Sequence, residues 1–216
     1  MAKIKCSNTE ENILRAAEKL FYERGYAMTH TTDIAKEAGC NQALVHYYFR
    51  SKEKLFEQVF ESKLRLFVSV FLSTGNDEKR FEDKLRKKIE AHFEILRKNP
   101  RLPFLLLNEF STNPNRLSSF RANLGKVPEG ILQRLDEELQ ELASQGVIRH
   151  IRALDLMLSI ISLNAIIFMA EPVIKTMIGS NEKQFKEILE QRKSENVEII
   201  LSRLRTATAT HNLLSN

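Results

Sequence analysis

The sequence predicts an all-α protein in which a small N-terminal helix-turn-helix domain precedes a larger helical domain. Two observations support this fold class. Apolar residues recur at three- and four-residue spacing, whereas the alternation that is typical of half-buried strands is absent. Only seven glycines and five prolines occur in 216 residues, so long helical stretches are uninterrupted. We expect the two domains to span residues 8–55 and 56–210.

The first domain contains three short helical patterns. The first pattern has an apolar stripe formed by Ile13, Ala17, Leu20 and Phe21. Gly25 can end this helix in a left-handed conformation, because glycine has no Cβ to clash there. The second pattern is a small apolar face that precedes Gly39 and consists of Ile34, Ala35 and Ala38. A glycine between two short helices is typical of the helix-turn-helix, whose second helix enters the major groove of DNA.

The third pattern predicts that recognition helix. Asn41 is placed to cap its first turn through the side-chain oxygen. Its inner face, which anchors the helix to the domain, is formed by Val45, Tyr48 and Phe49. Its outer face presents an amide, an aliphatic group, an imidazole and a phenol, from Gln42, Leu44, His46 and Tyr47. Gln42 is the predicted base reader, because an amide can bond N6 and N7 of adenine together.

The run GYAMTHTTDIAKEAGCNQALVHYYFRSKEKL, residues 25–55, resembles the N-terminal signature of the tetracycline-repressor (TetR) family. That signature has a GY pair, a TT or TS pair before DIA, an AG turn, and a YxYF-like segment followed by SKE. The resemblance is close over residues 10–60 and weak beyond them. It implies a DNA-reading head followed by a helical domain through which two chains form a dimer.

Carried over position by position, the resemblance gives roles to single residues. Thr29 and Thr32 are expected near the sugar-phosphate backbone. His46 and Lys52 occupy positions where the family commonly contacts phosphate. The residues expected to face the major groove are Gln42, Ala43, Leu44 and Tyr47, and the capping residue Asn41 is counted with them as DNA-binding.

Three residues depart from the family pattern. Leu44 stands where threonine is frequent, His46 where tyrosine is frequent, and Arg50 where proline is frequent. Leucine cannot hydrogen-bond a phosphate but can touch a thymine methyl group, which favours apolar readout by Leu44. The alternative for Leu44 is a buried core position, and for His46 a surface imidazole without a partner. In contact with phosphate, an imidazole makes DNA binding mildly pH-sensitive near neutrality.

Charge and cysteine content restrict the classes of function. A net charge of +5 favours a polyanionic partner, but residues 1–60 carry nine basic and eight acidic side chains, so binding must depend on placed contacts. The five histidines show neither HExxH nor a paired metal spacing, and no phosphate-binding glycine loop occurs. We therefore predict no catalytic residue, no metal and no cofactor. Two cysteines and the lack of a signal-peptide pattern favour the cytoplasm.

Beyond residue 60 the sequence predicts longer helices. We expect them over residues 52–72, 81–97, the segment LPFLLLNEF, 128–144, 153–178 and 182–205. Pro172 is expected to kink the helix over 153–178 or to end its regular part.

Residues 156–170, LMLSIISLNAIIFMA, contain no charged side chain. A membrane span needs about 20 apolar residues, so we predict instead a helix buried on every side, in part by another subunit. The last helix has a matching stripe, formed by Phe185, Ile188, Leu189, Val197, Ile200, Leu201 and Leu204. These two helices from each of two chains predict a four-helix dimer interface. A dimer would place two reading heads about 34 Å apart on a palindromic operator.

Isolated polar groups among aromatic residues predict a cavity for a small apolar or amphipathic ligand. The candidate residues are His92, Phe93, Asn108, Glu109, Phe110, Asn164 and Phe168. Each has a core position as its alternative, and for Asn164 this is a satisfied buried amide.

Together these observations predict a homodimeric transcriptional repressor that binds double-stranded DNA and is released by a small hydrophobic molecule. Two alternatives stay open: an activator of the same fold, and a helical small-molecule or lipid carrier without a DNA role. A carrier would not need the exposed amide and aromatic groups that follow Gly39. An α-helical enzyme would need a catalytic constellation, which the motifs do not provide.

Overall fold

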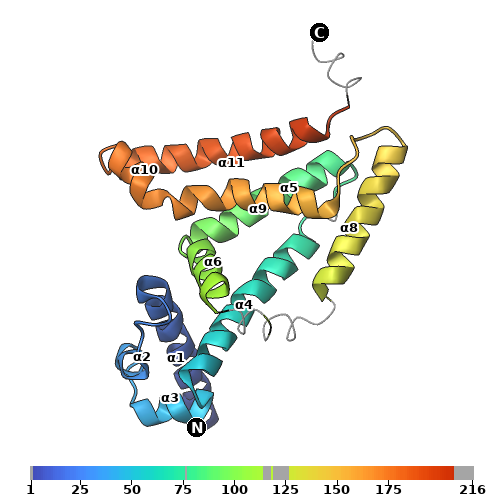
Figure 1. Ribbon diagram of the computed structural model, residues 1–216. Helices are drawn as coiled ribbons and strands as arrows, with labels where there is room; N and C mark the ends of the chain where they lie inside the picture. The colour runs from blue at the N-terminus through green and yellow to red at the C-terminus, as the bar shows by residue number, and fades with distance from the viewer. Residues whose placement is uncertain (1, 76, 114–117, 119–126, 207–216) are drawn as a thin grey trace. The chain divides into compact units, whose positions relative to one another are not determined.

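The computed structural model describes residues 2–75, 77–113, 118 and 127–206, and every regular element among them is a helix, as predicted (Figure 1). The helices are α1 (Ala2–Arg24), α2 (Thr31–Glu37), α3 (Gln42–Phe49), α4 (Lys52–Ser73), α5 (Phe81–Lys98), α6 (Leu102–Thr112), α8 (Val127–Ser144), α9 (Ala153–Met169), α10 (Glu171–Met177) and α11 (Glu182–Leu204). Contacts divide the chain into two compact units. Unit 1 joins Met1–Ser69 to Phe104–Phe120, and unit 2 joins Val70–Pro103 to Arg121–Asn216.

Unit 1 has one apolar core, around which α1, α2 and α3 gather at the start of α4 (Figure 1). The predicted stripe of α1 is buried in it, together with Ile34 and Ala35 of α2. The ring of Phe21 meets that of Phe56 in α4 edge-on, with centroids 5.0 Å apart. α1, α2 and α3 therefore share their core with α4, which supplies apolar surface that so small a domain lacks by itself.

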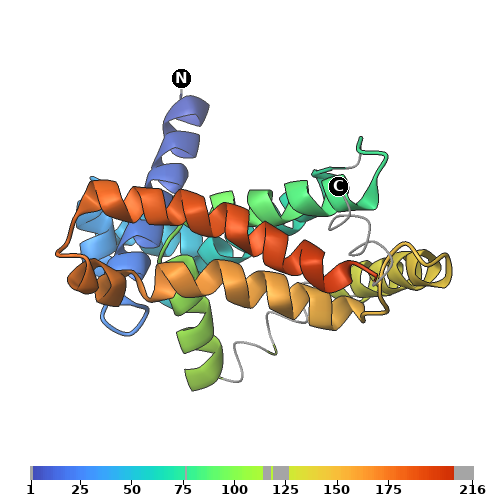
Figure 2. The same ribbon diagram turned by 90° about the horizontal axis from the view of Figure 1, so that it is seen from above.

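Unit 2 is built on α5, α9 and α11. Figures 1 and 2 show α9 and α11 side by side, and α5 packs against both. The buried faces of these helices repeat at helical spacing; in α11 they comprise Phe185, Leu189, Val197, Ile200, Leu201 and Leu204. The predicted stripe of the last helix is thus buried within the chain, except for the half-buried Ile188.

The predicted helix over residues 153–178 is two helices. α9 ends at Met169, and α10 begins at Glu171 with Pro172 in its first turn. The two axes differ by 56°. Proline has no N–H to continue the hydrogen-bond ladder, so the predicted kink is confirmed and the single long helix is corrected. No single helix in the described ranges is long and apolar enough to cross a membrane, although the bent pair α9–α10 passes that test when taken together.

Three polar side chains lie buried between the helices of unit 2. Asn164 of α9 donates through Nδ2 to the carbonyl oxygen of Ile89 at 3.0 Å and to Nδ1 of His92 at 3.1 Å. Its Oδ1 accepts from Nδ2 of Asn196 in α11 at 2.9 Å. Burial lowers the pKa of His92 to about 4, so the ring is neutral at pH 7 and Nδ1 can accept. The amide of Asn164 is therefore satisfied inside the core, one of its two predicted environments.

Candidate nucleic-acid interface

A tight turn joins α2 to α3 in unit 1. Gly39 adopts the left-handed conformation, with φ of 68°, and the N–H of Cys40 donates to the carbonyl oxygen of Ala35 at 2.9 Å. The side-chain oxygen of Asn41 accepts from the N–H of Leu44 at 2.9 Å. The helix stop at Gly39 and the cap at Asn41 are both confirmed, and together they let α3 start directly after α2 ends.

The two faces of α3 have opposite environments. Val45 and Phe49 are buried and Tyr48 packs against the core of unit 1, as the predicted inner face requires. The exposed side chains are those of Gln42, Ala43, His46 and Tyr47, and Tyr47 keeps 65% of its surface accessible. Leu44 is half-buried, between the two environments predicted for it. A large phenol held in solvent on an anchored helix is well placed to meet a partner.

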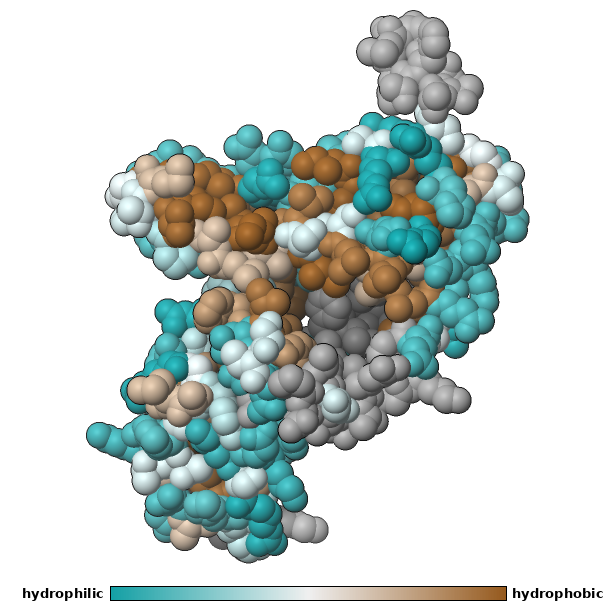
Figure 3. All heavy atoms as spheres, in the orientation of Figure 1, coloured by the Kyte–Doolittle hydropathy of each residue, from teal (hydrophilic) through white to brown (hydrophobic). Residues whose placement is uncertain are grey.

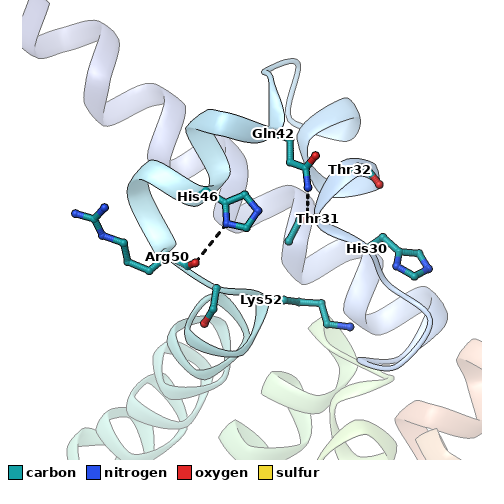
Figure 4. A pocket seen from close by; sticks show the side chains of 8 residues that line it. His30, Thr31, Thr32, Gln42, His46, Arg50 and Lys52 are labelled. Atoms are coloured by element: carbon teal, nitrogen blue, oxygen red, sulfur yellow. Dashed lines mark hydrogen bonds between the residues drawn. The ribbon is translucent and has the colours of Figure 1, made fainter.

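An open pocket of about 450 Å³ lies beside α3 (Figure 4). Its lining comes from the starts of α2 and α4 and from one side of α3, and consists of His30, Thr31, Thr32, Gln42, His46, Arg50, Ser51 and Lys52. These side chains offer hydroxyl, amide, imidazole and cationic groups but no carboxylate. Such a lining suits a phosphate group, because it offers hydrogen-bond donors and contains no like charge to oppose the anion.

Arg50 closes α3 in an unusual backbone conformation. Its φ is 62° and its ψ is −42°, and the N–H of Ser51 donates to the carbonyl oxygen of Phe49 at 2.6 Å, which is the bond of a γ-turn. The carbonyl oxygen of Arg50 lies 3.3 Å from Nδ1 of His46. Because a carbonyl oxygen only accepts, this contact places a hydrogen on Nδ1. A bond from Nε2 to phosphate then requires the doubly protonated, cationic ring.

We expect Arg50→Pro, which restores the residue frequent in the family, to destabilise this protein by about 3 kcal/mol. Proline requires φ near −65° and would remove the N–H that Arg50 donates to the carbonyl oxygen of His46 at 2.9 Å. Arg50→Gly should instead stabilise slightly relative to Arg50→Ala, which removes the charge and keeps the strain. Urea unfolding of the three variants tests this, and a proline variant as stable as the alanine variant would contradict it.

Two residues expected at the DNA backbone bond to carbonyl oxygens of the chain itself. Thr29 is fully buried, and its hydroxyl donates to the carbonyl oxygens of Gly25 at 2.8 Å and Leu20 at 3.2 Å. The expectation for Thr29 is thus corrected, because its hydroxyl holds the loop after α1. Lys52 lines the pocket, but its Nζ donates to the carbonyl oxygens of Tyr26 and Thr29, each at 3.0 Å. The ammonium also lies 4.1 Å from the ring centroid of Tyr26.

Thr31 is a site residue that the sequence analysis missed. Its Oγ1 accepts a hydrogen bond from Nε2 of Gln42 at 3.0 Å, across the gap between the starts of α2 and α3 (Figure 4). The neighbouring Thr32 is exposed and lines the same pocket, as its predicted place near the DNA backbone requires. The TT pair marked this region, but which of the two hydroxyls meets Gln42 depends on how α2 and α3 cross.

The predicted ligand-contacting residues belong to two different compact units. Asn108, Glu109 and Phe110 of α6 lie in unit 1, where the ring of Phe110 packs 5.3 Å from that of Phe60. The members in unit 2 are His92, Phe93, Asn164 and Phe168. The rings of Phe93 and Phe168 lie 5.1 Å apart and are both buried, so this aromatic pair occupies the core position left open for it.

Two family models match the chain. The first, described as bacterial regulatory proteins of the tetR family, matches residues 13–59 and so contains α2, the turn and α3. The second, described as a tetracyclin repressor-like C-terminal domain, matches residues 82–200. Between them they include the pocket beside α3 and most of unit 2.

The chain is also similar to individual bacterial regulators and to a solved structure. The chain is 26% identical to the fatty acid metabolism regulator protein of Bacillus subtilis (strain 168) over 137 residues, which are 63% of this chain and 69% of that protein. It is also 26% identical to the probable acrEF/envCD operon repressor of Escherichia coli (strain K12), over 74% of this chain and 73% of the relative. A crystal structure of a HlyIIR mutant protein superposes with a TM-score of 0.64 at 28% identity, covering 93% of this chain and 97% of that one.

Proposed function

The chain belongs to the TetR family of bacterial regulatory proteins, and on that basis we propose that it is a repressor that binds a palindromic operator as a dimer and is released by a small molecule. The observation that carries the DNA-reading part is the exposed outer face of α3 beside a pocket without carboxylates. We assign residues 8–55 to DNA binding and residues 56–210 to ligand binding and dimerisation. We place its action in the cytoplasm, where its DNA partner is found.

Base readout falls to the first half of α3. The amide of Gln42 can accept from N6 of adenine and donate to N7, a pair worth roughly 1 to 3 kcal/mol of discrimination. Ala43 and Tyr47 are exposed beside it, and the half-buried Leu44 can offer apolar contact to a thymine methyl group. We assign backbone positioning to Thr32 and His46 at the pocket, with Lys52 strengthening the local positive potential.

Dimerisation is supported by apolar side chains that one chain leaves uncovered. Figure 3 shows apolar residues gathered over the layer of α9, α10 and α11. On α9 the exposed members Leu154, Leu158 and Ile161 follow one another at spacings of four and three residues and so form one stripe. Ile199 of α11 is exposed as well. A contiguous apolar face of this kind typically marks a protein interface, and we propose α9 and α11 as the dimer helices.

A ligand-responsive C-terminal domain is supported by the family and by the named role of a relative. The B. subtilis protein, at 26% identity, is a fatty acid metabolism regulator. We propose an apolar or amphipathic effector for the present chain. Release from the operator then requires that the effector binds the DNA-incompetent state more tightly, since a ligand shifts an equilibrium only by its differential affinity.

The test begins with the DNA sequences that the full-length protein selects from a random pool, which should contain palindromic half-sites. The double variant Gln42→Ala with Tyr47→Ala should lose at least roughly 10³-fold in operator affinity and bind all sequences alike, with helix content and dimer mass unchanged. Gln58→Ala removes an exposed glutamine of α4 and serves as the matched control. Retained sequence preference in the double variant would overturn the assignment of α3 as recognition helix.

A further inference from the structure

The amide of Gln42 is held by Thr31 before any DNA is bound. Gln42 is the first residue of α3 and Thr31 the first residue of α2, and Nε2 of Gln42 donates to Oγ1 of Thr31 at 3.0 Å. Figure 4 shows the amide turned toward Thr31 at the edge of the pocket, with Thr32 close by. Gln42 is exposed and Thr31 half-buried, so the bond fixes an otherwise free side chain.

The orientation of the Gln42 amide decides whether it can bind adenine, because each adenine atom pairs with only one end of the amide. N7 of adenine requires a hydrogen from Nε2, and the N6 amino group requires Oε1 as its acceptor. Nε2 carries two hydrogens, so one can remain on Thr31 while the other meets N7. Rotation of the amide by 180° would present Oε1 to N7, which is acceptor against acceptor. The side chain that decides this orientation therefore contributes to specificity without touching a base.

A hydroxyl group can either donate or accept, so Thr31 alone does not fix the polarity of its bond to Gln42. A phosphate oxygen near Thr31 would fix this polarity, because a phosphate oxygen only accepts hydrogen bonds. When the hydroxyl hydrogen of Thr31 goes to a backbone phosphate seated in the pocket, Oγ1 is left as an acceptor for Nε2 of Gln42. The adenine-reading orientation of the amide is then the one that satisfies both groups.

We propose that Thr31 is a positioning residue for base readout, which couples the seating of one DNA phosphate to the orientation of the Gln42 amide. This inference rests on the proposed role of α3 as the recognition helix. It separates the two neighbouring threonines by function. Thr31 acts on specificity through Gln42, whereas Thr32 acts on affinity through the backbone alone.

The experiment measures the affinity of the full-length protein for its selected operator and for variants with each base pair replaced in turn. Gln42→Ala identifies the base pair that Gln42 reads as the position where discrimination falls. Thr31→Val should reduce discrimination at that same position by roughly 3- to 10-fold, the effect of one hydrogen bond. Discrimination at other positions should stay unchanged. Thr31→Ser, which keeps the hydroxyl, should restore discrimination.

Two further variants make the result decisive. Thr32→Val should lower affinity for all operators by the same factor. The double variant Thr31→Val with Gln42→Ala should discriminate no worse than Gln42→Ala alone, because Thr31 affects discrimination only through the amide. If Thr31→Val reduces discrimination equally at all positions, or leaves discrimination unchanged at the position read by Gln42, the role of Thr31 is overturned while that of Gln42 stands. If Gln42→Ala itself shows no position-specific loss, the base-reading function and the role of Thr31 both fail.

Discussion

Replacing Asn164 by leucine is expected to lower the free energy of unfolding by about 3 kcal/mol, although the two side chains are similar in size. The substitution leaves Nδ1 of His92 and one hydrogen of the Asn196 amide without their partner in the core of unit 2. A buried polar group deprived of its hydrogen bond costs about 1 to 3 kcal/mol. Burial also lowers the pKa of His92, so the ring stays neutral at pH 7 and Nδ1 remains an uncharged acceptor.

Asn196→Leu is the matched control. Oδ1 of Asn196 is buried and accepts no hydrogen bond from the described residues. Leucine removes this unsatisfied atom together with the two bonds that Nδ2 donates, to the carbonyl oxygen of Leu163 and to Oδ1 of Asn164. One unsatisfied buried oxygen, that of Asn196, is thus replaced by another, that of Asn164. We expect a cost of about 1 kcal/mol or less. The double variant should cost less than the sum of the two, since each single change orphans the other amide. Urea unfolding at one fixed chain concentration measures all three, and equal costs for the two single variants would contradict this account.

The sequence predicted best where one residue type has one physical role. Gly39 and Asn41 were predicted correctly because a left-handed stop and a helix cap are local features, fixed within a few residues of the chain. Val45 and Phe49 followed from helical periodicity, which decides which side of α3 is inside. The break at Pro172 was predicted for the same reason, as the missing N–H is a property of the residue itself.

Prediction failed where a polar side chain had several partners within reach. Thr29 was expected at DNA because the family pattern places it nearby, yet its hydroxyl bonds to backbone carbonyls. Lys52 lines the pocket beside α3 as its predicted role requires, but its ammonium also bonds to the carbonyl oxygens of Tyr26 and Thr29. The bond between Thr31 and Gln42 joins residues of two helices and depends on their crossing geometry. Periodicity gives the face on which a polar residue lies but not the partner that it finds there.

The ligand cavity stays a prediction, because its candidate residues are compatible with a core as well. Aromatic residues with isolated polar neighbours suggested a binding site, and the structure buries Phe93 against Phe168 and pairs His92 with Asn164. Composition is similar for a ligand-binding cavity and for a core that contains a satisfied polar group. Only the distances between the side chains distinguish the two.

A large effect on DNA binding is also expected from a change outside the recognition helix, in the proposed dimer stripe of α9. Leu158→Glu with Ile161→Glu places two charges on side chains that are 54% and 39% exposed in one chain and would be covered in the dimer. Burying an unpaired carboxylate costs more free energy than the remaining apolar contacts of the interface contribute, so the two chains should separate. The unfolding transition of the separated chain should then no longer depend on chain concentration.

Separation of the two chains removes the gain in operator affinity that comes from joining two DNA-binding domains in one dimer. A second head on the same dimer meets its half-site at an effective concentration in the millimolar range, which raises avidity by roughly 10²- to 10⁴-fold. We therefore expect the double variant to lose operator affinity by that factor while its affinity for an isolated half-site stays unchanged. Leu107→Glu places the same charge on a leucine of α6 that is 57% exposed, and it should leave the dimer intact. The mass of the protein in solution and its titration with operator DNA test this prediction. A double variant that stays dimeric and binds the operator fully would show that α9 does not form the interface.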